Sequence, residues 1–274
     1  MKIARIFPTK TSMSPTDKNA YFDAPDMFTP NDYDEAHISI TFTWDIDKGH
    51  RIAKEWGNHA RVVKIGGVAV DGESKNCFVS GMYLREGITI TSRGCPNNCS
   101  FCLVNKNGMI EFDDFPEGNI VQDNNILACS DRHWGLVMSM LRKQKDICMK
   151  GGLEARRVTT KKAENLRSLR IRELWLACDH DGAIEPLSKA IQILRKAGFS
   201  DSHFYCFVLI GMEEQRLRAV RNLGVMPFAQ LYMKPENKKT EYTDEMKKYQ
   251  RLMSRPAITR NIFNNPKPKS QSTL

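Results

Sequence analysis

The sequence predicts an α/β fold organised around a parallel sheet, and three observations support this prediction. Between residues 88 and 232, six strand-like runs alternate with helix-like stretches, the rhythm of strand–crossover–strand units. The chain of 274 residues is long enough for one or two domains with a proper core. Its composition, 41% hydrophobic and 27% charged, is that of an ordinary globular protein and excludes wholesale disorder.

The first 67 residues predict a smaller α/β region. A first strand is expected near residues 2–7, and residues 8–35, rich in Pro, Thr, Asp and Asn, are expected to form a loop. Residues 36–44 alternate and are β-branched, which predicts a strand. A helix-like stretch at 48–57 and a strand at 61–67 follow. Strand, helix and strand over about thirty residues match a βαβ unit with a parallel pair.

The rest of the chain continues this alternation. The six further strands are predicted at 88–94, 119–127, 147–152, 173–179, 204–211 and 226–232. Helices are predicted at 133–143, 160–170, 185–197, 213–223 and 241–253, with a loop at 103–118 and a disordered tail at 264–274. Six strands joined by crossovers imply a parallel sheet, which can be curved or closed toward a barrel. Ligands of such folds bind at the carboxyl ends of the strands, so residues at those ends are the candidates for function.

The net charge of +9 is unevenly distributed. Residues 139–172 hold eleven basic and three acidic residues, and residues 234–274 hold ten basic and four acidic residues. A basic surface attracts polyanions, which makes a nucleotide or nucleic acid a candidate partner. The alternative is that these stretches are solvated helix faces followed by a basic tail.

The sequence predicts a cytoplasmic protein with no membrane segment. No apolar run approaches the length of about 18 residues that crosses a bilayer. The first twelve residues lack the apolar core and cleavage site of a secretory signal. In a reducing compartment, eight cysteines are expected to be thiols or metal ligands rather than a disulfide framework.

Three cysteines form a tight cluster directly after a predicted strand. Cys95, Cys99 and Cys102 have the spacing CxxxCxxC, so three thiolates on one short loop can converge on a common centre. A structural zinc site takes four protein ligands, and no second CxxC pair is present to complete one. Three thiolates could instead hold three irons of a cubane cluster and leave the fourth iron open for chemistry. Unpaired thiols, or zinc completed by His or water, are the alternatives, whereas Cys148, Cys178 and Cys206 are expected to fill the core.

The CxxxCxxC spacing after a first strand, with Phe101 just before the third cysteine, resembles the radical S-adenosylmethionine superfamily. The resemblance implies a partial (β/α)6 TIM-type barrel and a 4Fe–4S cluster bound by Cys95, Cys99 and Cys102. It also implies that the open iron chelates S-adenosylmethionine, which one electron cleaves to methionine and a 5′-deoxyadenosyl radical that abstracts hydrogen from the substrate. An electron donor such as flavodoxin or ferredoxin is implied as a partner, and the substrate is not identified.

The resemblance carries further site residues to the ends of the later strands. Where family members have a GGE-like sequence that supports the methionine amino group, this chain has Asp123, Asn124 and Asn125. The next strand ends at Gly152 and is followed by Glu154 and Arg156, and either Arg156 or the adjacent Arg157 could pair with the methionine carboxylate. The remaining cofactor candidates are Phe101, Asp179 for the ribose or substrate, and Ile210 for the adenine.

The chain is also similar to small stand-alone radical S-adenosylmethionine proteins of bacteria and phages. This resemblance implies a Rossmann-like region at 1–85, a partial barrel at 86–235, and a basic helix and tail at 236–274. The first part resembles a shortened cobalamin-binding domain, but its DxHxxG signature is missing after the first strand, so no cobalamin is expected. The expected function is hydrogen abstraction by a radical enzyme. The alternatives are a radical methyl- or methylthio-transferase and a non-catalytic binding protein built around zinc or an iron–sulfur centre.

Overall fold

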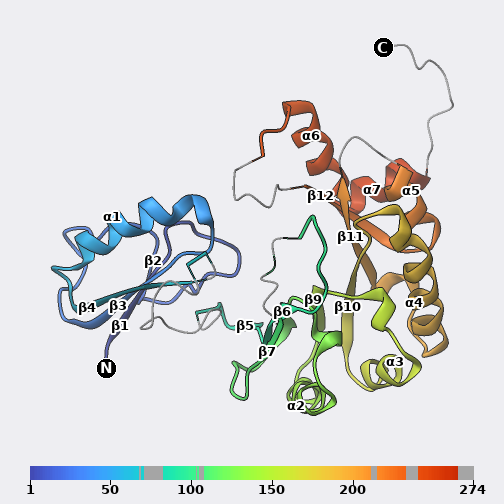
Figure 1. The fold of residues 1–274 in the computed structure, drawn as a ribbon, viewed down its shortest axis with the longest axis horizontal. Helices are drawn as coiled ribbons and strands as arrows, with labels where there is room; N and C mark the ends of the chain where they lie inside the picture. Colours follow the sequence, from blue (N-terminus) through green and yellow to red (C-terminus); the bar gives the residue numbers. More distant parts are fainter. Residues whose placement is uncertain are drawn as a thin grey trace. The chain divides into compact units, whose positions relative to one another are not determined.

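The chain has an α/β fold with parallel sheets (Figure 1). The structure, a computed structural model, describes residues 1–67, 69–70, 83–102, 104, 108–210, 215–232 and 240–264. It divides into two compact units, one formed mainly by Met1–Thr89 and the other by Ile90–Pro235 with Thr240–Leu274. Among the described helices, none combines the length and the apolar character needed to span a membrane.

The first unit contains a four-stranded parallel sheet. Its strand order is β2-β1-β3-β4, formed by β1 (Ile3–Ile6), β2 (Ala20–Tyr21), β3 (Tyr33–Ser39) and β4 (Ala60–Gly66). Helix α1 (Ile46–Trp56) connects β3 to β4, so the predicted βαβ unit is confirmed. Some boundaries differ from the prediction, because β2 lies inside the expected loop and β3 spans residues 33–39 instead of 36–44.

Apolar and polar side chains alternate along β3, and this pattern explains the core of the first unit. Ala36 and Ile38 are fully buried and share a core cluster with Ile52 and Trp56 of α1. The intervening residues of a strand point to the opposite face of the sheet, and in β3 these include Glu35 and His37. The helix therefore covers an apolar face, and the opposite face carries polar side chains.

The larger sheet has six strands in the order β12-β11-β10-β9-β8-β5, of which β8 to β12 belong to the second unit and β5 falls in the range Met1–Thr89. Its strands are β5 (Gly87–Thr89), β8 (Gly118–Val121), β9 (Ile147–Leu153), β10 (Ile171–Ala177), β11 (Phe204–Ile210) and β12 (Met226–Leu231). From β8 to β12, each strand pairs in parallel with the next along the chain. The crossovers are α2 (Asp131–Arg142), α3 (Thr160–Arg167), α4 (Ile184–Lys196) and α5 (Gln215–Asn222), which confirms the predicted alternation of strands and helices. No closed barrel is present in the described part of the chain.

The first predicted strand of this region is divided in two. Residues 88–94 contribute to β5 and then to β6 (Ser92–Cys95), which pairs antiparallel with β7 (Gly108–Glu111). The sequence had predicted loop at 103–118, so β7 was missed. At Gly94, with φ +85°, a Cβ would lie 1.9 Å from the Gly108 carbonyl oxygen, so the close approach of β6 and β7 requires glycine. This hairpin places Cys95 at the end of a strand.

The helix predicted at 241–253 is present in the C-terminal region, and a second helix that was not predicted follows it. Two helices, α6 (Asp244–Met253) and α7 (Pro256–Asn264), both contact β12. Met253 is 3% exposed and joins the core cluster of the second unit. Helices α6 and α7 therefore pack against the sheet, and the predicted tail after residue 264 lies outside the described residues.

Candidate metal and cofactor site

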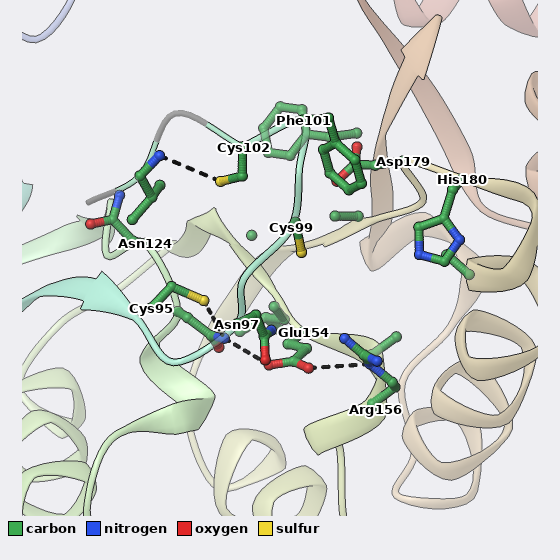
Figure 2. A pocket seen from close by; sticks show the side chains of 18 of the residues that line it. Cys95, Asn97, Cys99, Phe101, Cys102, Asn124, Glu154, Arg156, Asp179 and His180 are labelled. Carbon is green, nitrogen blue, oxygen red and sulfur yellow. Dashed lines mark hydrogen bonds and ion pairs between the residues drawn. The ribbon is translucent and has the colours of Figure 1, made fainter. Parts of the chain in front are cut away.

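A cavity of about 310 Å³ lies at the carboxyl ends of several strands of the second unit. The three clustered cysteines line it together with residues that follow β8, β9 and β10. Figure 2 shows Cys95, Cys99 and Cys102 around this space, with Glu154 and Asp179 also at its wall. The cavity is where ligands of parallel α/β folds bind, which agrees with the expectation from the sequence.

The three thiols influence one another electrostatically. Cys95 ends β6, and Cys99 and Cys102 follow on the connecting loop, where the Cys102 amide donates to the Cys99 carbonyl at 3.2 Å. Burial raises the pKa of the Cys99 thiol, and the neighbouring Cys102 and Cys95 raise it further because thiolate charges repel. A cationic centre between them would remove this repulsion. Thiolates are soft ligands, the type that iron–sulfur clusters, zinc and Cu(I) prefer.

The other described cysteines do not reach this site. Cys129, Cys148, Cys178 and Cys206 are free and buried, so Cys148, Cys178 and Cys206 fill the core as predicted. Among the described residues, no group of three or more His, Cys, Asp or Glu side chains converges as ligands of one metal ion would. The thiolates of a cubane bind different irons, so they need not converge on one point.

Asp123 is a correction to the predicted cofactor residues. Its side chain is 1% exposed and does not line the cavity. It accepts hydrogen bonds from the backbone amide of Thr91 at 2.7 Å and from the Ser92 hydroxyl at 2.7 Å. Burial raises the pKa of the Asp123 carboxyl, and these hydrogen bonds oppose that rise. Asp123 therefore fixes the segment that leads into β6, instead of facing a cofactor ammonium.

The next two residues do reach the cavity. Asn124 accepts a hydrogen bond from the Gly94 amide at 3.0 Å, and Asn125 is 3% exposed. The Asn125 side-chain Nδ2 donates to Glu154 Oε2 at 2.7 Å and to Cys95 Sγ at 3.3 Å. This contact connects the end of β8 to the first cysteine and to the residue that follows β9.

Glu154 is held in its ionised form. Burial would raise the pKa of its carboxyl, but hydrogen bonds from Asn125, Asn97 and Arg157 lower the pKa below its usual value. Arg157 Nε lies 2.7 Å from Oε2 and Arg156 Nε lies 3.3 Å from Oε1. The Arg156 side chain remains 61% exposed, so its guanidinium is accessible to an anionic group.

Two glycines shape the cavity wall at the end of β9. At Gly151, a Cβ would lie 1.9 Å from the Asp123 carbonyl oxygen, so only glycine allows the backbone after β8 to approach this strand. At Gly152, with φ +96°, a Cβ would meet nothing within 4 Å. Gly152 therefore presents bare backbone to the cavity, where a ligand can approach closely.

The far side of the cavity follows β10. Burial raises the pKa of the Asp179 carboxyl, while His180 and Arg216 act to lower it. Arg216 of α5 donates to the backbone oxygens of Asp179 at 3.3 Å and Leu209 at 2.6 Å, which ties the ends of β10 and β11 together. Across the cavity, the Phe101 ring lies 6.2 Å from the His180 ring, between centroids.

Ile210 is a second correction. Its side chain is 2% exposed, belongs to the core cluster and does not line the cavity. Alternation in β11 turns Ile210 toward the helices, and Phe207 lines the cavity in its place. Gln230 of β12 and Asn97 of the cysteine loop also line the cavity and were not predicted. Because side chains alternate between the two faces of a strand, the pattern along β11 could have indicated that Phe207 faces the cavity. No pattern in the sequence indicates the same for Asn97 and Gln230.

Comparisons with known proteins add no identification to this geometry. The chain matches no protein-family model, no curated protein and no solved structure. The arrangement of the residues around the cavity is therefore the basis on which a function is proposed.

Proposed function

We propose that the chain is a radical S-adenosylmethionine enzyme that abstracts hydrogen from an as yet unidentified substrate. The observation that supports this most is the placement of Cys95, Cys99 and Cys102 on one cavity at the carboxyl ends of parallel strands. In this proposal, the open sheet and its helices act as a partial (β/α)6 barrel. The reaction would take place in the reducing cytoplasm, where thiols remain available as ligands.

The donor set fits a 4Fe–4S cluster. It consists of three soft thiols that repel one another when ionised, beside a cavity with room for a ligand. When bound, such a cluster would supply the electron that cleaves S-adenosylmethionine into methionine and a 5′-deoxyadenosyl radical. The protein's own contribution is to position the groups and to exclude side reactions.

The lining residues have chemistry that suits the parts of this cofactor. The accessible guanidinium of Arg156 can pair with the methionine carboxylate. The bare backbone at Gly152 and the polar side chain of Asn124 can accept the methionine amino end. Asp179 can accept hydrogen bonds from ribose hydroxyls, and Phe101 offers an aromatic face to the cavity.

The partners of this reaction are predictions. An electron donor such as flavodoxin or ferredoxin would reduce the cluster. A nucleotide or nucleic acid as substrate rests on the basic stretch at 139–172, but several of its cations already have acidic partners, including Lys143 with Glu117 and Lys150 with Glu173. If nucleic acid is retained by the protein, the retention should fall steeply with salt.

The test is anaerobic reconstitution of the full chain with iron and sulfide. We expect about four irons and four sulfides per chain, the content of one cubane cluster. Dithionite and S-adenosylmethionine should then yield 5′-deoxyadenosine. Cys99→Ala should lose both the cluster and this product. Cys129→Ala, which removes a thiol outside the cavity, should keep both.

Two results would contradict the proposal. One is wild-type protein that binds no iron and sulfide, or Cys99→Ala protein that binds them equally well. The other is stoichiometric zinc without sulfide and no 5′-deoxyadenosine, which would identify a metal-centred binding protein instead. Transfer of a methyl or methylthio group to a product would assign the enzyme to the alternative radical class.

A further inference from the structure

One side chain in the cavity contacts a cysteine sulfur directly. Asn125, 3% exposed, places its Nδ2 at 3.3 Å from Cys95 Sγ and at 2.7 Å from Glu154 Oε2. An amide NH2 group has two hydrogens, so both contacts can form at once. Asn125 is therefore a bridge between the first cysteine and an anchored carboxylate.

Glu154 decides which end of the amide faces the sulfur. An ionised carboxylate can only accept hydrogen bonds, so the amide must turn its NH2 group toward Glu154. Glu154 is itself held by Arg157 at 2.7 Å and by Arg156 at 3.3 Å, which keeps the carboxylate in place. The same NH2 group then has its second hydrogen available for Cys95. The Asn125 carbonyl oxygen is turned away and is buried without a partner among the described residues.

The three cysteines are therefore unequal. In the described part of the chain, Cys102 Sγ accepts a hydrogen bond from the backbone amide of Val104 at 3.5 Å, and no hydrogen bond to Cys99 Sγ occurs there. Within the described residues, Cys95 is the one cysteine of the three that receives a side-chain N–H, and a charged neighbour fixes the direction of that group. A hydrogen bond to a ligand sulfur stabilises the more negatively charged state of an iron–sulfur cluster and so raises its reduction potential.

We propose that Asn125 is a positioning residue that raises the reduction potential of the cluster through its hydrogen bond to Cys95, with Glu154 fixing the orientation of the amide. This inference rests on the proposed function, because it needs a cluster at the cysteines. It gives Asn125 and Glu154 a role toward the cluster, separate from any contact with S-adenosylmethionine. The role is specific to one of the three cysteine ligands.

The experiment compares midpoint potentials of reconstituted protein without S-adenosylmethionine, by redox titration followed by electron paramagnetic resonance. Asn125→Ala removes the donor and should shift the potential to a more negative value at unchanged iron and sulfide content. Gln230→Ala is the control, because Gln230 also lines the cavity but lies on β12, and it should leave the potential unchanged.

A second measurement uses the protein before reconstitution. Iodoacetamide labelling, followed residue by residue by mass spectrometry, should change at Cys95 in Asn125→Ala and stay unchanged at Cys102, because Asn125 Nδ2 contacts the Cys95 sulfur at 3.3 Å. Equal potentials in wild type and Asn125→Ala, or equal labelling of Cys95, would overturn the inference. Wild-type protein that takes up no cluster would instead defeat the proposed function, while the labelling still reports whether the hydrogen bond exists.

Discussion

The two parallel sheets of this chain use their polar side chains in opposite ways. In the first unit, Glu35 lies 2.7 Å from Lys64 and 2.5 Å from His37, and His37 also bonds the Tyr83 hydroxyl. These groups lie along the strands and satisfy one another. In the second unit, polar groups gather at the carboxyl ends of the strands and line a cavity.

The pKa shifts of two carboxyl groups express this difference. Hydrogen bonds from Lys64 and then His37 lower the pKa of Glu35, so ionisation of Glu35 stabilises the folded unit. Burial raises the pKa of Asp179 in the cavity wall, so its ionisation costs stability. Polar groups that are paired contribute to the fold, and those held against a cavity at a cost to stability are typical of functional sites.

The largest expected loss of stability comes from replacing the glycines at which two backbone segments approach closely. In Gly151→Ala, the new Cβ would lie 1.9 Å from the Asp123 carbonyl oxygen, and we expect a loss of about 4 kcal/mol or more in the free energy of unfolding, with loss of cluster uptake. In Gly67→Ala of the first unit, the Cβ would lie 2.5 Å from the Ile40 carbonyl oxygen at φ +113°, so that unit should be destabilised while the second unit keeps its cluster.

The measurements are urea denaturation and the iron and sulfide content after reconstitution. Gly135→Ala in α2 serves as the control, because its Cβ would meet nothing within 4 Å, and the better helix propensity of alanine should add about 0.5–1 kcal/mol of stability. If Gly151→Ala took up as much iron and sulfide as the wild type, the cavity would not depend on the close approach of Gly151 to Asp123. The two sheets would then not differ in the way described.

A smaller effect is expected from Asp123→Ala. The substitution leaves the buried Thr91 amide and the Ser92 hydroxyl without their acceptor, which should cost about 2–4 kcal/mol. It should also lower the cluster content, because the same carboxylate fixes the segment before Cys95. Asp123→Asn keeps the size and one acceptor, so it should lose less. If S-adenosylmethionine affinity fell in Asp123→Asn with stability and cluster content unchanged, Asp123 would have the cofactor role that the sequence predicted.

The smallest changes in stability are expected from two acid-to-amide substitutions, which should shift the melting temperature in opposite directions. At neutral pH, Glu35→Gln should lower the melting temperature of the first unit, because it removes a stabilising charge. Asp179→Asn should raise the melting temperature of the second unit, because it removes a charge that burial disfavours. Thermal unfolding followed by circular dichroism measures both.

The pH dependence separates these two substitutions further. The folded pKa of Glu35 lies below its usual value of 4.5, so its contribution is present above pH 4.5 and is lost as the pH falls through the folded pKa. The folded pKa of Asp179 lies above 3.8, so the advantage of Asp179→Asn should be absent below pH 3.8 and should grow as the pH rises through the folded pKa. If both substitutions shifted the melting temperature in the same direction, the distinction between paired and cavity-facing carboxylates would be wrong.

The periodic part of the fold was predictable from the sequence. Apolar, β-branched runs and the helices between them predicted five of the six strands in the large sheet and the βαβ unit of the first region, because period 2 and period 3.6 are local properties. The division of residues 88–94 and the strand β7 were not predictable. They depend on the antiparallel pairing of two segments across a polar stretch, which local patterning does not contain.

The cavity residues show the same limit. The sequence correctly indicated that residues after β8, β9 and β10 would gather at one end of the sheet, since parallel strands share their carboxyl edge. It could not indicate that Asp123 turns to Thr91 and Ser92 while Asn124 and Asn125 turn to the cavity. Adjacent polar residues look alike in a sequence, and their directions depend on which backbone groups a neighbouring segment leaves unsatisfied.

The sequence by itself determined the alternation of strands and crossover helices from β8 to β12, the cysteine spacing and the edge of the sheet where chemistry is expected, because each depends on residues close together in the chain. Only the tertiary structure decided that Asn125, with Glu154 behind it, contacts Cys95. Asn125 lies about thirty positions from Cys95 and about thirty from Glu154 in the sequence. The contacts therefore exist only once β6, β8 and β9 have been brought together in the folded unit.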